Sequence, residues 1–113
     1  METEDLALEH DLNQIIRTAV DRIVAVAHPT LIVLFGSAAR GQLGPNSDLD
    51  FLVVVEEPVH RRRLAQAIYR NLVGVGFPID IVVATAEDVA QYRDNPAMVI
   101  SPALREGKTV YAA

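Results

Sequence analysis

Three aspartates and a glycine–serine pair have the residue types and spacing to carry out chemistry. Asp48 and Asp50 begin an apolar run, and since side chains alternate along a strand, both point to one face. Like charges at that distance repel, and burying either carboxylate is unfavourable unless a cation accompanies it. Mg²⁺ takes oxygen ligands, commonly a few carboxylates together with phosphate oxygens and water. The pair therefore indicates a Mg²⁺ site.

A third carboxylate, Asp80, lies near the start of another apolar segment, residues 79–84. A helix between the two segments would make them parallel neighbours, because parallel strands need a crossover connection. Their starting ends would then lie side by side. If the faces agree, we expect Asp80 to join Asp48 and Asp50 at one edge of the sheet.

Gly36 and Ser37 end an earlier apolar run and could hold phosphate groups. Glycine lets the backbone approach a ligand closely, and a short helical turn predicted at residues 38–40 presents free N–H groups to an anion. Arg40, one turn further on, is a candidate to reach phosphate oxygens. Together with the aspartates, this pair predicts binding of a magnesium–nucleoside triphosphate complex.

The elements that must position these residues follow from hydrophobic periodicity and turn residues. Helices are predicted at residues 6–27, from Pro58 to Gly74, after a Thr85 cap, and from about 96 to 106 with Gly107 as terminator. Strands are predicted at 31–35, 48–55, 79–84 and 109–111, with a loop at 42–47. The short link between the first two strands favours an antiparallel pair. The fold class is α/β (α+β), a small mixed β-sheet with helices packed on it.

Length and composition narrow the range of functions. The 113 residues predict a single domain, 1–113, without room for a second domain of ordinary size. A net charge of -5 makes a nucleic-acid partner unfavourable but permits a nucleotide, since a metal ion screens the triphosphate. No cysteine is present for a disulfide or a thiolate metal site. The acidic start and the short apolar runs predict a cytoplasmic protein without a membrane span.

Each of these candidates also has a structural interpretation. Taken singly, the aspartates could be a strand-entry cap, a solvated strand charge and an edge-strand charge. Ser37 could be a plain turn residue and Arg40 an ordinary surface arginine. Their combination at this spacing favours function. The basic triplet at residues 61–63 is interpreted as a solvated face, and the tyrosines 69, 92 and 111 as packing residues.

The same residues resemble a known family. Gly36-Ser37, ten intervening residues and then Asp48-Leu49-Asp50 match the signature of the DNA polymerase β-type nucleotidyltransferase superfamily. The segments 36–41 and 46–53 look like its minimal nucleotidyltransferase (MNT) branch, and so does the ending at 103–111. Asp80 falls where that family carries its third carboxylate. The resemblance covers most of the chain from Leu31 onward and implies the polymerase β-type nucleotidyltransferase fold.

The resemblance also implies an activity and roles for the residues. Asp48, Asp50 and Asp80 would hold one or two Mg²⁺ ions, and Asp80 is also a candidate general base. Gly36, Ser37 and, less strongly, Arg40 would bind the nucleotide, with ATP as the substrate. Members of the MNT branch are commonly paired with a helical HEPN-domain toxin, and they can transfer AMP to one of its tyrosines as antitoxins.

Two other functions stay open at this stage. The chain could neutralise a toxin by complex formation alone, without catalysis. It could also modify a small molecule such as an aminoglycoside, with a pocket built between two subunits. The sequence determines neither the base preference nor the acceptor, and it leaves both homo- and hetero-oligomers open.

Overall fold

The computed structural model describes residues 2–42, 44, 47–56 and 58–113, and three residues of the predicted loop, 43, 45 and 46, lie outside that set. The elements are α1 (Glu2–Ala27), β1 (Leu31–Phe35), β2 (Leu49–Val55), α2 (Arg61–Asn71), β3 (Ile79–Thr85), α3 (Ala86–Tyr92), α4 (Ile100–Glu106) and β4 (Lys108–Ala112). This is the predicted order of helices and strands. In the described part of the chain, no helix has the length and apolar character to cross a membrane.

The four strands form one mixed sheet in the order β3-β2-β1-β4. β1 pairs antiparallel with both β2 and β4, and β2 pairs parallel with β3. Both predicted pairings, antiparallel for the first two strands and parallel across the α2 crossover, are confirmed. The predicted fold class, a small mixed sheet with helices packed on it, is also confirmed.

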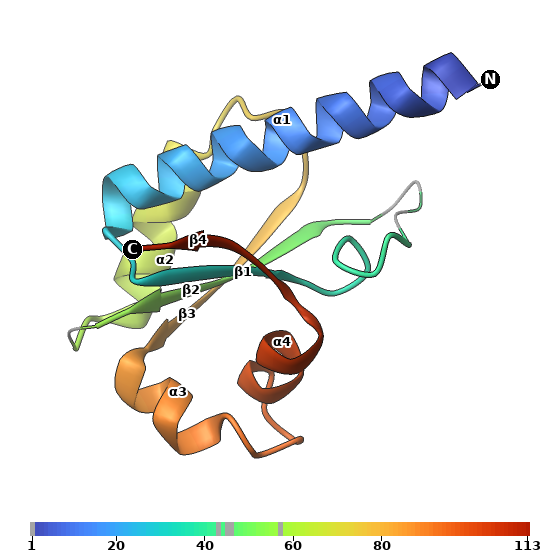
Figure 1. Cartoon of the computed structure of the whole chain (residues 1–113). Coiled ribbons are helices and arrows are strands. Elements are labelled where there is room, and N and C mark those ends of the chain that lie inside the picture. The colour runs from blue at the N-terminus through green and yellow to red at the C-terminus, as the bar shows by residue number, and fades with distance from the viewer. Residues whose placement is uncertain (1, 43, 45–46, 57) are drawn as a thin grey trace.

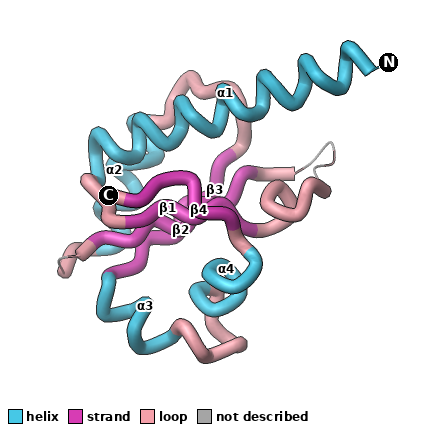
Figure 2. Tube along the Cα trace, viewed as in Figure 1, coloured by secondary structure: helices cyan, strands magenta, loops and turns pink. Residues whose placement is uncertain are grey.

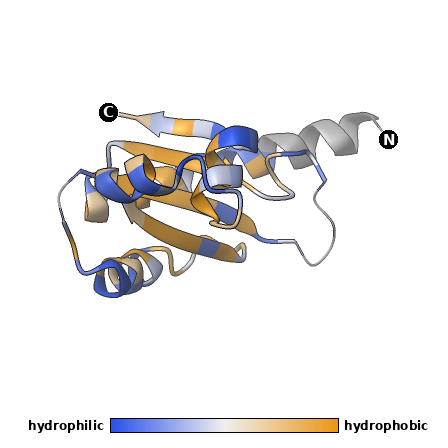
Figure 3. Ribbon diagram, turned by 90° about the horizontal axis from the view of Figure 1, so that it is seen from below, coloured by the Kyte–Doolittle hydropathy of each residue, from blue (hydrophilic) through white to orange (hydrophobic). Residues whose placement is uncertain are grey.

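Helices cover both faces of the sheet, α1 and α2 on one side and α3 and α4 on the other (Figures 1 and 2). The buried cluster on the α1–α2 side consists of Ala19, Val20, Ile23, Ile32, Leu34, Ala39, Leu49, Phe51, Val53, Ile68, Leu72 and Ile81. The cluster on the α3–α4 side consists of Val33, Leu52, Val54, Ala84, Ile100 and Ala103. Because both faces are covered, the central strands are continuous apolar runs, and they take the hydrophobic colour in Figure 3.

Two helices are shorter than the sequence predicts. α2 begins at Arg61 and not at Pro58, because the ring of His60 accepts a hydrogen bond from the Arg63 amide (3.2 Å) and caps the helix there. α4 begins at Ile100, so the predicted start near residue 96 is wrong. The Asn95 side chain accepts from the Ala97 amide (3.1 Å), a local turn that competes with helix.

Gly107 ends α4 as predicted, but not through a left-handed conformation, since its φ is -78°. A Cβ atom at this position would overlap the Ala103 carbonyl oxygen and the Val33 side chain. Glycine is therefore needed because α4 packs tightly against β1, directly before the chain enters β4.

Candidate functional site

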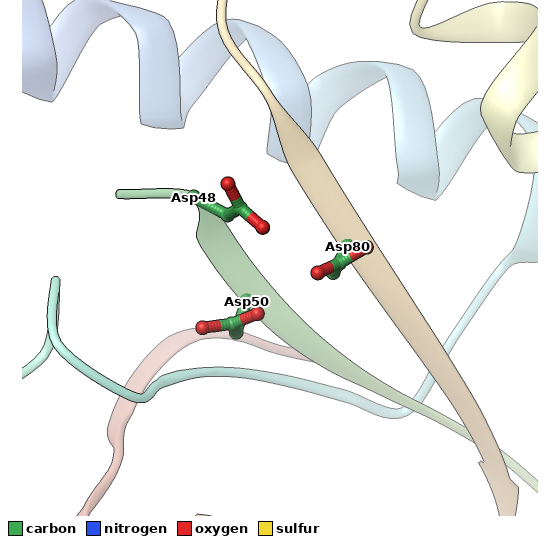
Figure 4. Close-up of side chains that lie close together, drawn as sticks. All are labelled: Asp48, Asp50 and Asp80. Atoms are coloured by element: carbon green, nitrogen blue, oxygen red, sulfur yellow. The ribbon is translucent and has the colours of Figure 1, made fainter. Parts of the chain in front are cut away.

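The fold brings the three aspartates together at one end of the sheet. Asp50 in β2 lies beside Asp80 in β3 in the parallel register, and Asp48 directly precedes β2. One carboxylate oxygen of each residue lies within 4.8 Å of those of the other two (Figure 4). Asp50 and Asp80 stand two residues before Leu52 and Val82 of the α3–α4 side, so their faces agree. The predicted meeting of the three residues is confirmed.

The site is crowded with negative charge. Burial raises the pKa of Asp50, and the charges of Asp80 and Asp48 raise it further. Phe35, the cross-strand neighbour of Asp50 in β1, packs against the α3–α4 cluster. Burial likewise raises the pKa of Asp80, followed by its hydrogen bond and charge interaction with Asp48. In the described residues, no basic side chain forms an ion pair with any of the three.

This donor set fits a hard divalent cation. Three carboxylates converge from two adjacent strands, they repel one another, and no basic partner offsets that repulsion in the described residues. Mg²⁺ binds such oxygen ligands and supplies the missing positive charge. Asp48, Asp50 and Asp80 are therefore the residues that could hold it.

The Gly36–Ser37 turn lies against this cluster. Gly36 has a φ of +74°, and a Cβ atom there would overlap the carboxylate of Asp50. The Ser37 carbonyl accepts from the amides of Arg40 (3.2 Å) and Gln42 (2.8 Å), so the predicted helical turn is confirmed. The left-handed backbone conformation favours glycine here, and the lack of a Cβ atom lets the Asp50 carboxylate lie close to the turn. The candidate phosphate turn and the metal ligands thus form one continuous site.

Arg40 lies at the outer side of the turn. Its Nε atom donates to the Gln42 side chain (3.2 Å), and its Nη1 atom lies 3.9 Å from the Glu106 carboxylate. The side chain is half exposed, and in the described residues it forms no hydrogen bond or ion pair with an aspartate of the site. Its role in nucleotide binding stays a prediction.

Sequence reasoning missed the contribution of Tyr69. Its hydroxyl oxygen accepts a hydrogen bond from the Ile81 amide (2.9 Å), directly after Asp80. Tyr69 is 41% exposed, next to the buried Ile68 of α2, so core packing does not explain it. No signal in the sequence points to this contact, since it joins a helix to the edge of a strand.

The basic triplet at residues 61–63 is exposed, as the solvated-face interpretation expects, but Arg61 also has a structural role that the sequence did not indicate. Its guanidinium forms two hydrogen bonds with Asp88, at 2.8 and 2.6 Å. Asp88 and Thr85 form a reciprocal capping box at the start of α3. Although partial burial raises the pKa of Asp88, hydrogen bonds from the Thr85 backbone and Arg61 lower it overall. Beside the far end of β3, the Asp88 carboxylate thus has hydrogen-bond partners within the fold.

Comparisons with known proteins agree with this geometry. The family model described as nucleotidyltransferase domain matches residues 14–103, which include the glycine–serine turn and all three aspartates. The search of curated proteins gave no match. The chain is similar to a solved structure described as a crystal structure of the toxin-antitoxin with AMP-PNP, with a TM-score of 0.54. Sequence identity is 23%, over 84% of this chain and 72% of that chain, so this likeness supports the fold alone.

Proposed function

The chain belongs to the nucleotidyltransferase domain family, and from this membership we propose that it is a Mg²⁺-dependent enzyme that transfers AMP from ATP to a hydroxyl group of a partner protein. The observation that carries the proposal is the convergence of three carboxylates beside a glycine–serine turn. Membership of the family supports nucleotidyl transfer in general. ATP as the donor, Mg²⁺ as the metal ion and a protein as the acceptor are parts of our proposal.

The roles follow from where each residue lies. Asp50 on the inner strand β2, and Asp48 directly before that strand, would hold the cation that accompanies the triphosphate. The Gly36–Ser37 turn binds the β- and γ-phosphates through its backbone, and Arg40 is a weaker candidate for the same task. Asp80, on the outer strand and exposed, faces the acceptor as a further ligand and general base.

The transfer exchanges one bond to phosphorus for another. The acceptor oxygen bonds to the α-phosphorus, the bond from that phosphorus to the bridging oxygen breaks, and pyrophosphate leaves. The proton of the acceptor hydroxyl passes to the Asp80 carboxylate. Held by Asp48 and Asp50, Mg²⁺ would lower the pKa of the attacking group and stabilise charge on the leaving oxygens.

The exposure of the site favours a protein as the acceptor. Asp80 is exposed, and Asp48 and Asp50 are only partly buried. Small-molecule substrates usually bind in concave sites that bury most of their surface. The similar solved structure is a toxin–antitoxin containing AMP-PNP, an analogue of ATP. We propose that residues 1–113 act as one nucleotidyltransferase domain, a cytoplasmic antitoxin that modifies a tyrosine of a HEPN-type toxin.

Transfer of label tests this function directly. The purified chain is incubated with Mg²⁺, ATP labelled at the α-phosphate, and the protein encoded by the neighbouring gene. We expect the partner to become labelled, and peptide mapping to locate the label as AMP attached to a tyrosine. Absence of labelling with each of the four nucleotides, while Mg²⁺ still binds, would refute the proposal.

Paired variants separate transfer from neutralisation by binding alone. The double variant Asp48→Ala/Asp50→Ala removes the inner ligands, and Asp94→Ala is a matched control on the exposed segment after α3. We expect the double variant to lose both labelling and protection of cells from the toxin, while the control keeps both. If the double variant still protects cells, complex formation is the mechanism instead.

A further inference from the structure

The outer edge of the sheet beside Asp80 is fastened by side chains and not by a strand. In the part of the chain that the structure describes, β3 is an edge strand that pairs with β2 alone. The Leu49 amide donates to the Pro78 carbonyl (3.0 Å), so that carbonyl faces β2. Because backbone groups alternate in direction along a strand, Ile81 and Thr85 direct their N–H groups away from β2. These outward groups would otherwise be left to solvent.

Two of the outward amides of β3, those of Ile81 and Thr85, have side-chain partners that depend on α2. The Ile81 amide donates to the Tyr69 hydroxyl (2.9 Å), and Tyr69 belongs to α2. The Thr85 amide donates to Asp88 (2.9 Å), which is held in turn by Arg61 at the start of α2. One helix therefore fastens both ends of β3 from outside the sheet.

The contact at Tyr69 acts on the peptide group that follows Asp80. In that group the Asp80 carbonyl faces β2, while the Ile81 amide faces Tyr69. The group is thus held from both sides, which fixes the backbone angle that directs the Asp80 side chain. Asp80 needs this restraint more than Asp48 or Asp50 do, since like-charge repulsion pushes it outward and, within the described residues, no strand pairs with β3 on that side.

We propose that Tyr69 is a positioning residue that holds the edge of β3 so that the Asp80 carboxylate stays beside those of Asp48 and Asp50. The role requires the hydroxyl group, since the ring alone cannot accept the Ile81 amide. This inference rests on the proposed function, because it assigns Tyr69 a task at the metal site.

The test uses Tyr69→Phe, which removes the hydroxyl and keeps the ring. Amide hydrogen exchange, followed by NMR on the full chain without metal, should be at least about tenfold faster at Ile81 and unchanged at Thr85. Titration with Mn²⁺, followed by its paramagnetic signal, should show binding weakened about three- to tenfold, the range that a single neutral hydrogen bond supports.

Two control variants distinguish positioning from general loosening. Tyr111→Phe removes a hydroxyl on β4, at the opposite edge, that has no hydrogen-bond partner in the described residues. Asp88→Asn weakens the other fastening of β3. We expect both controls to bind Mn²⁺ as the wild type does.

The outcomes separate this inference from the proposed function. Unchanged exchange at Ile81, or Mn²⁺ binding by Tyr69→Phe equal to that of the wild type, overturns the role of Tyr69. A loss as large in Asp88→Asn also overturns it, since general loosening would then explain the effect. Failure of the wild type itself to bind Mn²⁺ refutes the metal site and the proposed function with it.

Discussion

The two ends of β3 handle negative charge in opposite ways. At its start, Asp80 meets Asp48 and Asp50, and the pKa values of Asp50 and Asp80 are raised because burial and like charge disfavour ionisation. At its end, Asp88 accepts hydrogen bonds from Thr85 and Arg61, and its pKa is lowered. An acid whose partners the fold supplies stabilises the chain. Acids crowded together without such partners mark the place where a cation is expected.

Neutralising one crowded acid should give the largest effect. We expect Asp50→Asn to lower the transfer rate about 10³-fold, the equivalent of several kcal/mol of metal assistance. Without metal, the same variant should be more stable than the wild type, because one source of repulsion is gone. Transfer assays and thermal unfolding with and without Mg²⁺ measure both effects. A variant that is inactive and also less stable without metal would contradict the comparison.

The second-largest effect is expected at the Gly36–Ser37 turn, beside the three aspartates. Gly36→Ala should cost about 1–3 kcal/mol from its backbone conformation alone, with a further loss from the overlap with Asp50. Gly41→Ala is the matched control, since its φ is +68° and a Cβ atom there meets nothing within 4 Å. Urea unfolding and nucleotide binding measure the difference. Equal costs for the two variants would show that Asp50 does not press on the turn.

Asp88, at the other end of β3, should contribute to stability and not to transfer. Asp88→Ala removes the capping box and the Arg61 ion pair, and should lower the free energy of unfolding by about 1–2 kcal/mol. Transfer per folded molecule should stay within about twofold of the wild type, because no group of the candidate site changes. Urea unfolding and the transfer assay test both statements. Loss of transfer at full folding would place Asp88 in the active site.

The smallest effects are in the pH dependence of stability without metal. Asp50 and Asp80 have raised pKa values in the folded state. Their contribution to the free energy of unfolding is therefore complete below about pH 3.9, the unfolded pKa, and is lost as pH rises through the folded pKa values. Asp88 has a lowered pKa, so its contribution is present above about 3.9 and is lost as pH falls through the folded value.

Urea unfolding at a series of pH values measures these opposite slopes. The wild type should gain stability on mild acidification, and Asp50→Asn should gain less. The difference between the wild type and Asp88→Asn should stay constant at neutral pH and disappear in strong acid. Saturating Mg²⁺ should remove the gain on mild acidification, because bound cation keeps the carboxylates ionised.

Much of the fold could be read from the sequence, because its signals are local. Continuous apolar runs predict strands covered on both faces, and the Thr85 capping box predicts the start of α3. The first residues of α2 and α4 were harder to predict from the sequence. The ring of His60 and the side chain of Asn95 compete with helix formation in ways that periodicity does not register.

The sequence by itself determined which residues are candidates to carry the chemistry. Gly36, Ser37, Asp48 and Asp50 are fixed by spacing along one short stretch, and strand alternation puts both carboxylates on one face. Only the tertiary structure decided that Asp80 pairs with Asp50, that Asp50 presses against Gly36, and that Tyr69 fastens β3. These contacts join separate helices and strands. They depend on strand register and on packing, which the spacing of residues along the sequence does not determine.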